Sequence, residues 1–279
     1  MIPQVRTLAT YEAFTEHLQA LGLELPVARV VTADGALAQP LTIRDGSARD
    51  LQVANRFAIL PMEGWDGTAD GRPTDLVRRR WQRFADGGAG LVWAEATAIC
   101  HEGRANPHQL QLDHSTVGEL AALRQLFGEG QVVGLQLTHS GRYSRPDGAP
   151  APRTAYRHPL LDGPSGANDA ALLSDGELDD LVALFVDRAV LTGEAGFDFV
   201  DVKACHGDLG HELLTAHDRP GRYGGDFTNR TRFMRSIIEG IRSAAPQLAI
   251  GVRLSAFDML PHVPGDELRR ADGVAVDLG

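Results

Sequence analysis

The chain has 279 residues, of which 43% are hydrophobic and 23% charged, and its formal net charge is −10. This size and composition are typical of one large globular domain, and the negative charge argues against nucleic acid and anionic membranes as partners. No apolar stretch reaches the ~20 residues that span a bilayer, and the N-terminus lacks a basic-then-apolar signal pattern, so we expect a cytoplasmic protein. The two cysteines, Cys100 and Cys205, are too few and too far apart to predict a disulfide or a zinc site.

Taken in chain order, residues 1–50 are expected to form an N-terminal extension, with a helix over Tyr11–Leu21, and residues 51–279 a single domain. In that domain, apolar runs typical of buried parallel strands alternate with amphipathic stretches typical of helices. The expected strands are Arg56–Met62, Gly90–Glu95, Val132–Thr138, Phe199–Lys203 and Ala249–Leu254. The expected helices are Thr74–Ala85, Ser115–Phe127, Ser174–Glu194 and Asn229–Ala244. Ser174 and Glu177 have the spacing of a capping box.

This alternation predicts an α/β fold with a parallel sheet and right-handed crossovers. A nucleotide-binding doubly wound sheet would carry Gly-x-Gly-x-x-Gly after its first strand, and no such pattern follows the first strand here. Polar residues instead stand near the ends of several strands: Glu95, Gln136, Lys203 and Arg253. Because a (β/α)8 barrel builds its site from several strand ends at one mouth, the sequence favours a TIM-type barrel. The long irregular stretch over residues 140–173 is typical of a functional loop.

Lys203 is the single lysine of the chain, beside 26 arginines, and it closes an apolar run where a loop begins. Lysine is a compact charge on a flexible stem, whereas arginine is a planar fork that stays protonated. Together with His206, three residues on, Lys203 is suited to polarising a carbonyl or holding an anion. Asp201 or Asp208 could also pair with the lysine and make the cluster structural.

Gln136 and Arg253 are polar residues inside apolar strands. An amide offers donors and an acceptor, which suits the edge of a heterocycle, but a core glutamine bonded to backbone is the alternative. A guanidinium in such a strand needs an anionic or electron-rich partner, which could be a neighbouring carboxylate. The histidines between 206 and 217 lack the His-Glu-x-x-His spacing, so no metal site is expected.

Five segments in order carry a resemblance to a known family. They are Asn55–Met62, Gly87–Thr97, Gly134–Arg142, His206–Leu209 and Arg222–Phe233. From about Asn55 to Asp258 the sequence resembles the Old Yellow Enzyme family of FMN-dependent NAD(P)H oxidoreductases. The resemblance implies FMN as cofactor, NADH or NADPH as reductant, and a small-molecule substrate with an activated C=C bond.

The resemblance also implies roles for single residues. Pro61 and Met62 would lie against the flavin ring, Glu63 beside a flavin carbonyl, and Ala96 at the flank of the ring. Gln136 would bond the pyrimidine edge, and Arg253 would lie near the N1/C2 side and stabilise reduced flavin. Lys203 and His206 match the pair that binds the substrate carbonyl.

Three positions depart from the family pattern. Lys203 stands where relatives usually have histidine. Asp208 stands where many relatives have the tyrosine that protonates the substrate, and an aspartate would need a raised pKa to donate at neutral pH. Glu63 places a carboxylate near the flavin, which disfavours the anionic reduced form unless that carboxyl is protonated or paired.

The expected barrel is incomplete. Five strands and a sixth over Gly273–Asp277 give five to six β/α units, so strands seven and eight, whose loops hold the FMN phosphate in the family, are absent. A fragment of a longer protein is the favoured explanation. A partner chain or homo-oligomer that completes the barrel, and a reduced fold without flavin, are the others. Two other functions stay open: a Schiff-base lyase or aldolase that uses Lys203, and a non-catalytic remnant without flavin.

Overall fold

The computed structural model describes residues 3–44, 46–47 and 49–256, and the chain divides into two compact units, 1–39 and 40–279. The first unit contains helix α1 (Tyr11–Ala20), as predicted, between short 3-10 turns at Val5–Thr7 (η1) and Ala36–Ala38 (η2). The Thr10 hydroxyl accepts a hydrogen bond of 3.1 Å from the Ala13 N–H, which supplies the N-cap of α1.

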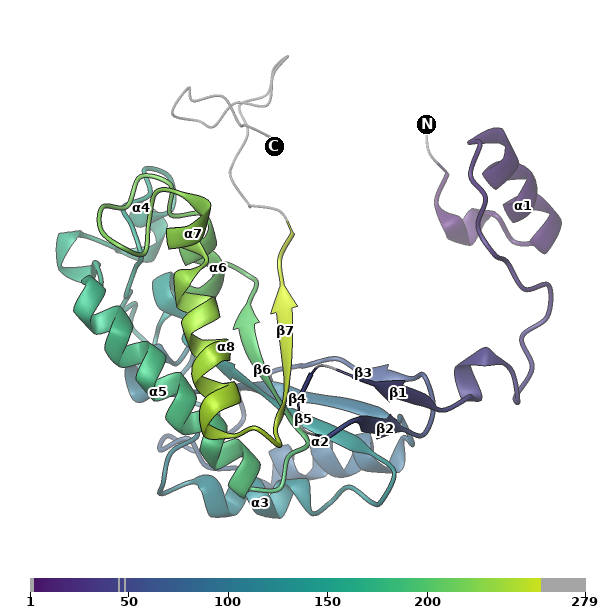
Figure 1. The fold of residues 1–279 in the computed structure, drawn as a ribbon, viewed down its shortest axis with the longest axis horizontal. Coiled ribbons are helices and arrows are strands. Elements are labelled where there is room, and N and C mark those ends of the chain that lie inside the picture. The colour runs from purple at the N-terminus through teal and green to yellow at the C-terminus, as the bar shows by residue number, and fades with distance from the viewer. Residues whose placement is uncertain (1–2, 45, 48, 257–279) are drawn as a thin grey trace. The chain divides into compact units, whose positions relative to one another are not determined.

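The second unit is built on a five-stranded parallel sheet (Figure 1). Its strands are β3 (Ala58–Ile59), β4 (Leu91–Ala98), β5 (Val132–Thr138), β6 (Phe199–Ala204) and β7 (Ala249–Leu254). They pair in chain order, which is the arrangement of a β/α barrel and confirms the predicted parallel sheet. A separate antiparallel pair, β1 (Leu41–Ile43) and β2 (Leu51–Val53), has one strand on each side of residue 50, where the sequence placed a boundary. The predicted sixth strand lies outside the described residues.

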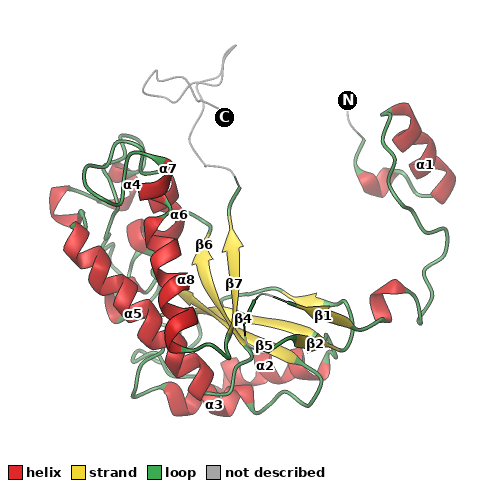
Figure 2. Ribbon diagram, in the orientation of Figure 1, coloured by secondary structure: helices red, strands yellow, loops and turns green. Residues whose placement is uncertain are grey.

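Four helices follow the strands and cover one face of the sheet (Figure 2). They are α2 (Asp75–Asp86), α3 (Val117–Arg124), α5 (Asp175–Glu194) and α8 (Arg232–Ala244). Shorter elements lie in the connecting loops: η3 (His101–Gly103), η4 (Gly141–Tyr143), α4 (Asp162–Ser165), η5 (Asp169–Ala171), α6 (Leu209–Leu214) and α7 (Phe227–Arg230). The predicted capping box of α5 is confirmed, because Ser174 and Glu177 exchange side-chain to backbone hydrogen bonds of 3.2 and 2.8 Å. Within the described ranges, no helix has the length and apolar character needed to cross a membrane.

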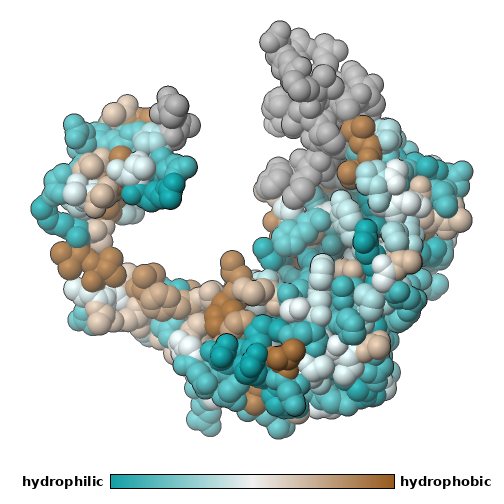
Figure 3. Space-filling view, turned by 180° about the vertical axis from the view of Figure 1, so that it is seen from behind, coloured by the Kyte–Doolittle hydropathy of each residue, from teal (hydrophilic) through white to brown (hydrophobic). Residues whose placement is uncertain are grey.

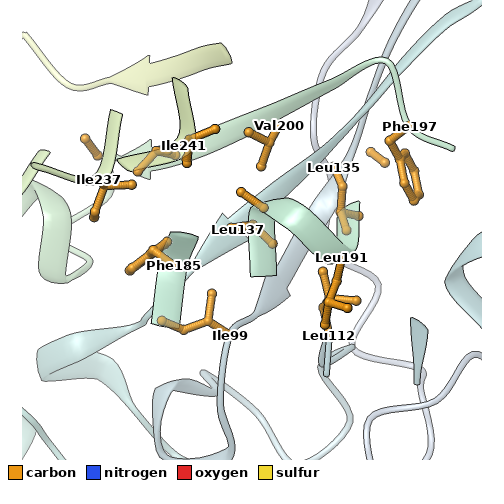
Figure 4. Close-up of a cluster of buried hydrophobic side chains, with 14 of the residues drawn as sticks. Ile99, Leu112, Leu135, Leu137, Phe185, Leu191, Phe197, Val200, Ile237 and Ile241 are labelled. Carbon is orange, nitrogen blue, oxygen red and sulfur yellow. The ribbon is translucent and has the colours of Figure 1, made fainter. Parts of the chain in front are cut away.

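The main core lies between the sheet and these helices (Figure 4). Successive side chains of a strand point to opposite faces, so Leu135, Leu137 and Val200 meet Phe185 and Ile241 from the helices. Each fully buried side chain of this size contributes roughly 1.5–3 kcal/mol. The same alternation sends the residues between them, including Gln136 and Asp201, to the other face of the sheet.

Two aromatic rings pack at the N-terminal end of that second, inner face. The rings of Trp93 and Phe199 meet edge to face with centroids 4.8 Å apart. Glycines on neighbouring strands leave the space: a Cβ at Gly134 would lie 2.2 Å from the Phe199 ring, and one at Gly251 would lie 2.8 Å from Trp93. Phe199 also packs with residues of β2, so the N-terminal end of the inner face is apolar and closed.

Glu95 does not join the polar residues of the inner face, and the expectation that it would is wrong. The β4–β5 register shifts between Ala94 and Ala96, which adds one residue to β4 and turns Glu95 toward α2. There its carboxylate accepts hydrogen bonds of 2.6 Å from Arg80 and 2.9 Å from the Trp81 indole.

Candidate active site

Polar residues of three adjacent strands come together toward the C-terminal edge of the inner face. The register places Gln136 beside Asp201, and Lys203 beside Arg253. Side chains alternate between the two faces along a strand, and paired residues of neighbouring strands point to the same face. Asp201 and Lys203 are two residues apart, so they and their partners Gln136 and Arg253 share one face. The sequence placed three of these four residues at one mouth, and the strand register brings them there.

Lys203 lies between two carboxylates. Its Nζ is 3.0 Å from Glu63 Oε1 and 2.8 Å from Asp208 Oδ2, and its side chain is only 6% exposed. Asp208 also accepts a hydrogen bond of 2.7 Å from the Thr138 hydroxyl, and Glu63 one of 2.6 Å from the Trp65 indole. Burial alone would lower the pKa of Lys203, but Asp208 and Glu63 outweigh it and raise that pKa above its ordinary value. The ammonium therefore stays charged, and one of its three N–H donors is left for a ligand.

Asp201 holds Gln136 in one orientation. The Gln136 side-chain amide donates to one oxygen of Asp201, and the Arg253 backbone N–H donates to the other at 2.7 Å. Burial raises the pKa of Asp201, and these hydrogen bonds oppose that shift. The side-chain carbonyl oxygen of Gln136 remains an acceptor for a ligand. The partner of Gln136 is thus a carboxylate, not the backbone that the alternative interpretation required.

The half-buried Arg253 guanidinium makes no hydrogen bond or ion pair with any described residue. The alternative interpretation, a salt bridge to a neighbouring carboxylate, is therefore not seen in this part of the chain. A guanidinium in such a position is suited to an anionic or electron-rich ligand.

His206 follows β6 in a left-handed conformation, with φ of 62°. The residue is exposed, and its backbone N–H donates to the Ser255 hydroxyl at 3.3 Å. Partial desolvation of the ring, together with the charges of Lys203 and Arg253, lowers the pKa of His206, so the imidazole is mainly neutral at pH 7.

The apolar positions implied by the resemblance differ in exposure. Met62 is 61% exposed, Pro61 is half-buried, and Ala96 is fully buried. Glu63, next to Met62, is tied to β6 through its ion pair with Lys203. Exposed apolar side chains of the second unit show as brown areas among teal and white ones on the face in Figure 3.

A second cluster, which sequence spacing did not reveal, consists of Cys100, Glu102 and His139. Their ligand atoms lie within 4.8 Å of one another, and the His139 side chain is fully buried. The Gly141 N–H points at His139 Nδ1 at 3.1 Å, and, although burial lowers the pKa of His139, Cys100 and Glu102 raise it to about 9, so Nε2 carries a proton. A metal ion on Nε2 would require the opposite tautomer, because a ligating histidine donates its other N–H. The cluster therefore fits a metal centre poorly.

A cavity of about 580 Å³ lies between the outer face of β7 and helices α6, α7 and α8. Its walls include Leu214, Met234 and Leu254 and contain none of Gln136, Lys203 or Arg253. The polar cluster is therefore a separate feature, on the opposite face of the sheet.

A parallel sheet paired in chain order, with its polar residues gathered at the C-terminal ends, defines a barrel-type α/β protein with an active-site edge. The sequence model of the NADH:flavin oxidoreductase / NADH oxidase family matches residues 36–265. The chain belongs to this family, which supports FMN as cofactor and NADH or NADPH as reductant.

Two curated relatives are NADPH dehydrogenases. The protein of Listeria monocytogenes serovar 1/2a is 31% identical over 241 residues, covering 81% of this chain and 69% of the relative. The protein of Bacillus velezensis is 28% identical over 217 residues, covering 76% of this chain and 62% of the relative. The chain thus spans about two thirds of the length of these relatives.

Solved structures show the same fold. Old Yellow Enzyme from Pichia sp. AKU4542 superposes with a TM-score of 0.68 at 23% identity, covering 81% of this chain and 61% of that chain. Morphinone reductase in complex with tetrahydroNAD superposes with a TM-score of 0.64 at 26% identity, covering 80% and 64%.

Proposed function

We propose that the protein is an FMN-dependent NAD(P)H oxidoreductase that reduces a C=C bond activated by a carbonyl group. The observation that carries the proposal is Lys203, a buried cation with one free N–H donor, on the same sheet edge as Gln136 and Arg253. That edge is where barrels of this type hold cofactor and substrate.

The donor set fits a flavin. The Gln136 carbonyl oxygen can accept from the N–H of the pyrimidine edge, and the Arg253 guanidinium can offset negative charge there. Pro61, Met62 and Ala96 would provide apolar contacts for the ring. When bound, FMN supplies hydride chemistry, with NADH or NADPH as the source. The tetrahydroNAD complex of morphinone reductase supports a nicotinamide as reductant in this fold.

The carboxylate of Glu63 is compatible with this assignment because it is paired. Its charge is offset by Lys203 at 3.0 Å, so the carboxyl is paired, as a carboxylate near reduced flavin would need to be. Lys203, with its remaining donor, and His206 would hold the substrate carbonyl and withdraw electrons from the C=C bond.

The Schiff-base alternative is disfavoured by the same ion pairs. A lysine attacks a carbonyl only as the neutral amine, and Asp208 and Glu63 hold Lys203 in its protonated form. The flavin-free alternative is decided by titration, because a remnant would not bind added FMN.

Completion of the barrel by further strands belongs to the proposal. Among the described residues, β3 and β7 are the edge strands of the sheet, and the outward residues Val252 and Leu254 of β7 are 37% and 58% exposed. Further strands and helices, from the rest of a longer protein or from a partner chain, would pair with the backbone edge of β7 and cover these outward side chains.

The test is flavin content and ligand binding of the purified protein. We expect a yellow protein whose flavin absorbance bleaches on addition of NADPH. Lys203→Met should weaken the binding of a phenolate ligand by roughly 10- to 100-fold, the worth of a hydrogen bond to a charged group, and should weaken FMN binding less, through the unpaired charge of Glu63. Arg235→Met, which removes a cation on the exposed face of α8, is the control. A colourless protein that binds no FMN contradicts the proposal. Loss of FMN from a folded Lys203→Met variant would show that Lys203 contacts the flavin and not the substrate.

A further inference from the structure

Asp201 is a fully buried carboxylate in the middle of the inner face. The inward side chains of β6 alternate with the outward ones, so Asp201 lies between Phe199 on its N-terminal side and Lys203 on its C-terminal side. The paired rings of Trp93 and Phe199 close the N-terminal side. On β7 the residue beside Asp201 is Gly251, which has no side chain to offer. The side of Asp201 that faces β5 is therefore the one from which a neighbouring strand supplies a polar side chain.

The contacts of Asp201 link it to Gln136 of β5. The Gln136 side-chain amide donates to Oδ2 of Asp201, and the Arg253 backbone N–H donates to Oδ1 at 2.7 Å. A carboxylate is costly to bury unless donors surround it, and these two N–H groups supply that compensation. Burial raises the pKa of Asp201, whereas Gln136, Trp93 and Arg253 lower it because each favours the charged form. The surroundings of Asp201 are thus suited to the carboxylate.

The carboxylate determines which way round the Gln136 amide lies. An ionised carboxylate only accepts hydrogen bonds, so the group of Gln136 that faces it must be the NH2 group. This NH2 group has two N–H donors, and Asp201 accepts from one of them. The carbonyl oxygen and the second N–H are left for a ligand. Gln136 therefore presents an acceptor beside a donor.

We propose that Asp201 is the positioning residue that sets the hydrogen-bonding pattern of Gln136 toward the cofactor. The inference rests on the proposed function, in which Gln136 bonds the pyrimidine edge of the flavin. That edge carries the N3–H donor between two carbonyl acceptors, which complements an acceptor beside a donor. Asp201 acts through Gln136 and not by contact with the flavin ring.

Asp201→Asn tests this orientation with almost no change in shape. The Arg253 backbone N–H can only donate, so it selects the oxygen of the new amide. The NH2 group of that amide then faces Gln136 and requires an acceptor there. The Gln136 amide turns round, and its NH2 group meets the N3–H of the flavin edge, donor against donor.

The first experiment compares the binding of FMN with that of 3-deaza-FMN, in which a C–H group replaces the N3–H donor. For the wild type, FMN should bind roughly 10- to 100-fold more tightly than 3-deaza-FMN, the range for a buried polar group left unsatisfied. In Asp201→Asn the flavin N3–H has no acceptor, so FMN affinity should fall by about the same factor and the preference for FMN should vanish. Asp180→Asn, on the exposed face of α5, is the control and should keep both affinities.

A second variant restores the pattern by moving the charge. Gln136→Glu combined with Asp201→Asn places the carboxylate at position 136, where its oxygens can accept both from the new amide and from the flavin N3–H. This double variant should regain a preference for FMN over 3-deaza-FMN of roughly tenfold or more, because a charged acceptor makes a strong hydrogen bond. A role of Asp201 in packing alone predicts no such recovery, since the shapes of the side chains are unchanged.

A measurement on the flavin-free protein tests the orientation directly. In proton–nitrogen NMR spectra, one side-chain amide proton of Gln136 should lie downfield of those of exposed glutamines, because it is bonded to a carboxylate. The signal is identified by its absence in Gln136→Glu, and in Asp201→Asn it should move into the range of exposed glutamines. The wild-type spectrum also decides the matter if Asp201→Asn does not fold: a Gln136 amide with the shifts of an exposed glutamine refutes the proposal.

The outcomes separate this inference from the function on which it rests. If the wild type binds FMN and folded Asp201→Asn keeps the preference for FMN over 3-deaza-FMN, the positioning role is refuted and the function stands. If the wild type binds neither flavin, the proposed function fails, and the NMR signal of Gln136 still decides whether Asp201 sets its orientation.

Discussion

Removing Lys203 should strongly destabilise the second unit, because two carboxylates depend on it. Lys203→Met keeps an unbranched stem of similar size but leaves Asp208 and Glu63, 9% and 20% exposed, without their cation. At about 2.9 Å and an effective dielectric constant near 20, each ion contact is worth roughly 5–6 kcal/mol before desolvation. Desolvation of the charges offsets much of this, and breaking a buried pair costs about 3–5 kcal/mol net.

The assay is urea unfolding at pH 7, followed by far-UV circular dichroism. We expect Lys203→Met to lose about 3–5 kcal/mol in the free energy of unfolding. The control Arg235→Met removes a cation that is 60% exposed and 3.9 Å from Glu239, and it should change stability by at most about 0.5 kcal/mol.

Two results would refute this reasoning. One is a loss below about 1 kcal/mol in Lys203→Met, the range of an exposed ion pair. The other is a double variant, Lys203→Met with Asp208→Asn, that is no more stable than Lys203→Met alone, since the second change removes one of the unpaired carboxylates.

Three further predictions follow from the geometry. Gly134→Ala should lower the free energy of unfolding by about 1–3 kcal/mol, because its Cβ would lie 2.2 Å from the Phe199 ring. Gly118→Ala, at an open position of α3, should raise the free energy of unfolding by about 0.5–1 kcal/mol. Equal effects of the two substitutions in denaturant titrations would contradict this. Ser174→Ala removes the N-cap of α5 and should cost about 1 kcal/mol by the same assay, and an unchanged midpoint would count against the cap. The folded-state pKa of Glu212 is raised from 4.5 to about 7, so between these values the native state binds the extra proton and stability falls as pH rises. The slope should approach about 1.4 kcal/mol per pH unit and disappear in Glu212→Gln, and an identical slope in both proteins would exclude Glu212 as its source.

Much of the fold could be read from the sequence because it depends on local pattern. Apolar runs and amphipathic stretches alternate with clear periods, and all five predicted strands and four long helices of the barrel unit appear near the expected positions. The first strand is the exception in extent: β3 covers only Ala58–Ile59, although the apolar run continues to Met62. The apolar run alone does not show where β3 stops pairing with β4, because pairing depends on the position of the neighbouring strand.

The candidate site was partly readable for the same reason. The period of two puts Gln136 and Lys203 on one face of neighbouring strands, and the strand order makes them neighbours in space. A one-residue bulge turns Glu95 away from that face, and the sequence of β4 contains no pattern that predicts the bulge.

The sequence by itself determined the class of sheet, the edge at which polar groups gather and the singular position of Lys203. Only the tertiary structure decided which charges meet: Lys203 with Glu63 across 140 residues, and Arg142 with Glu212 across 70. The physical reason is range. Strand and helix periods are set by neighbours along the chain, whereas an ion pair or a buried proton depends on residues that only the folded backbone brings together.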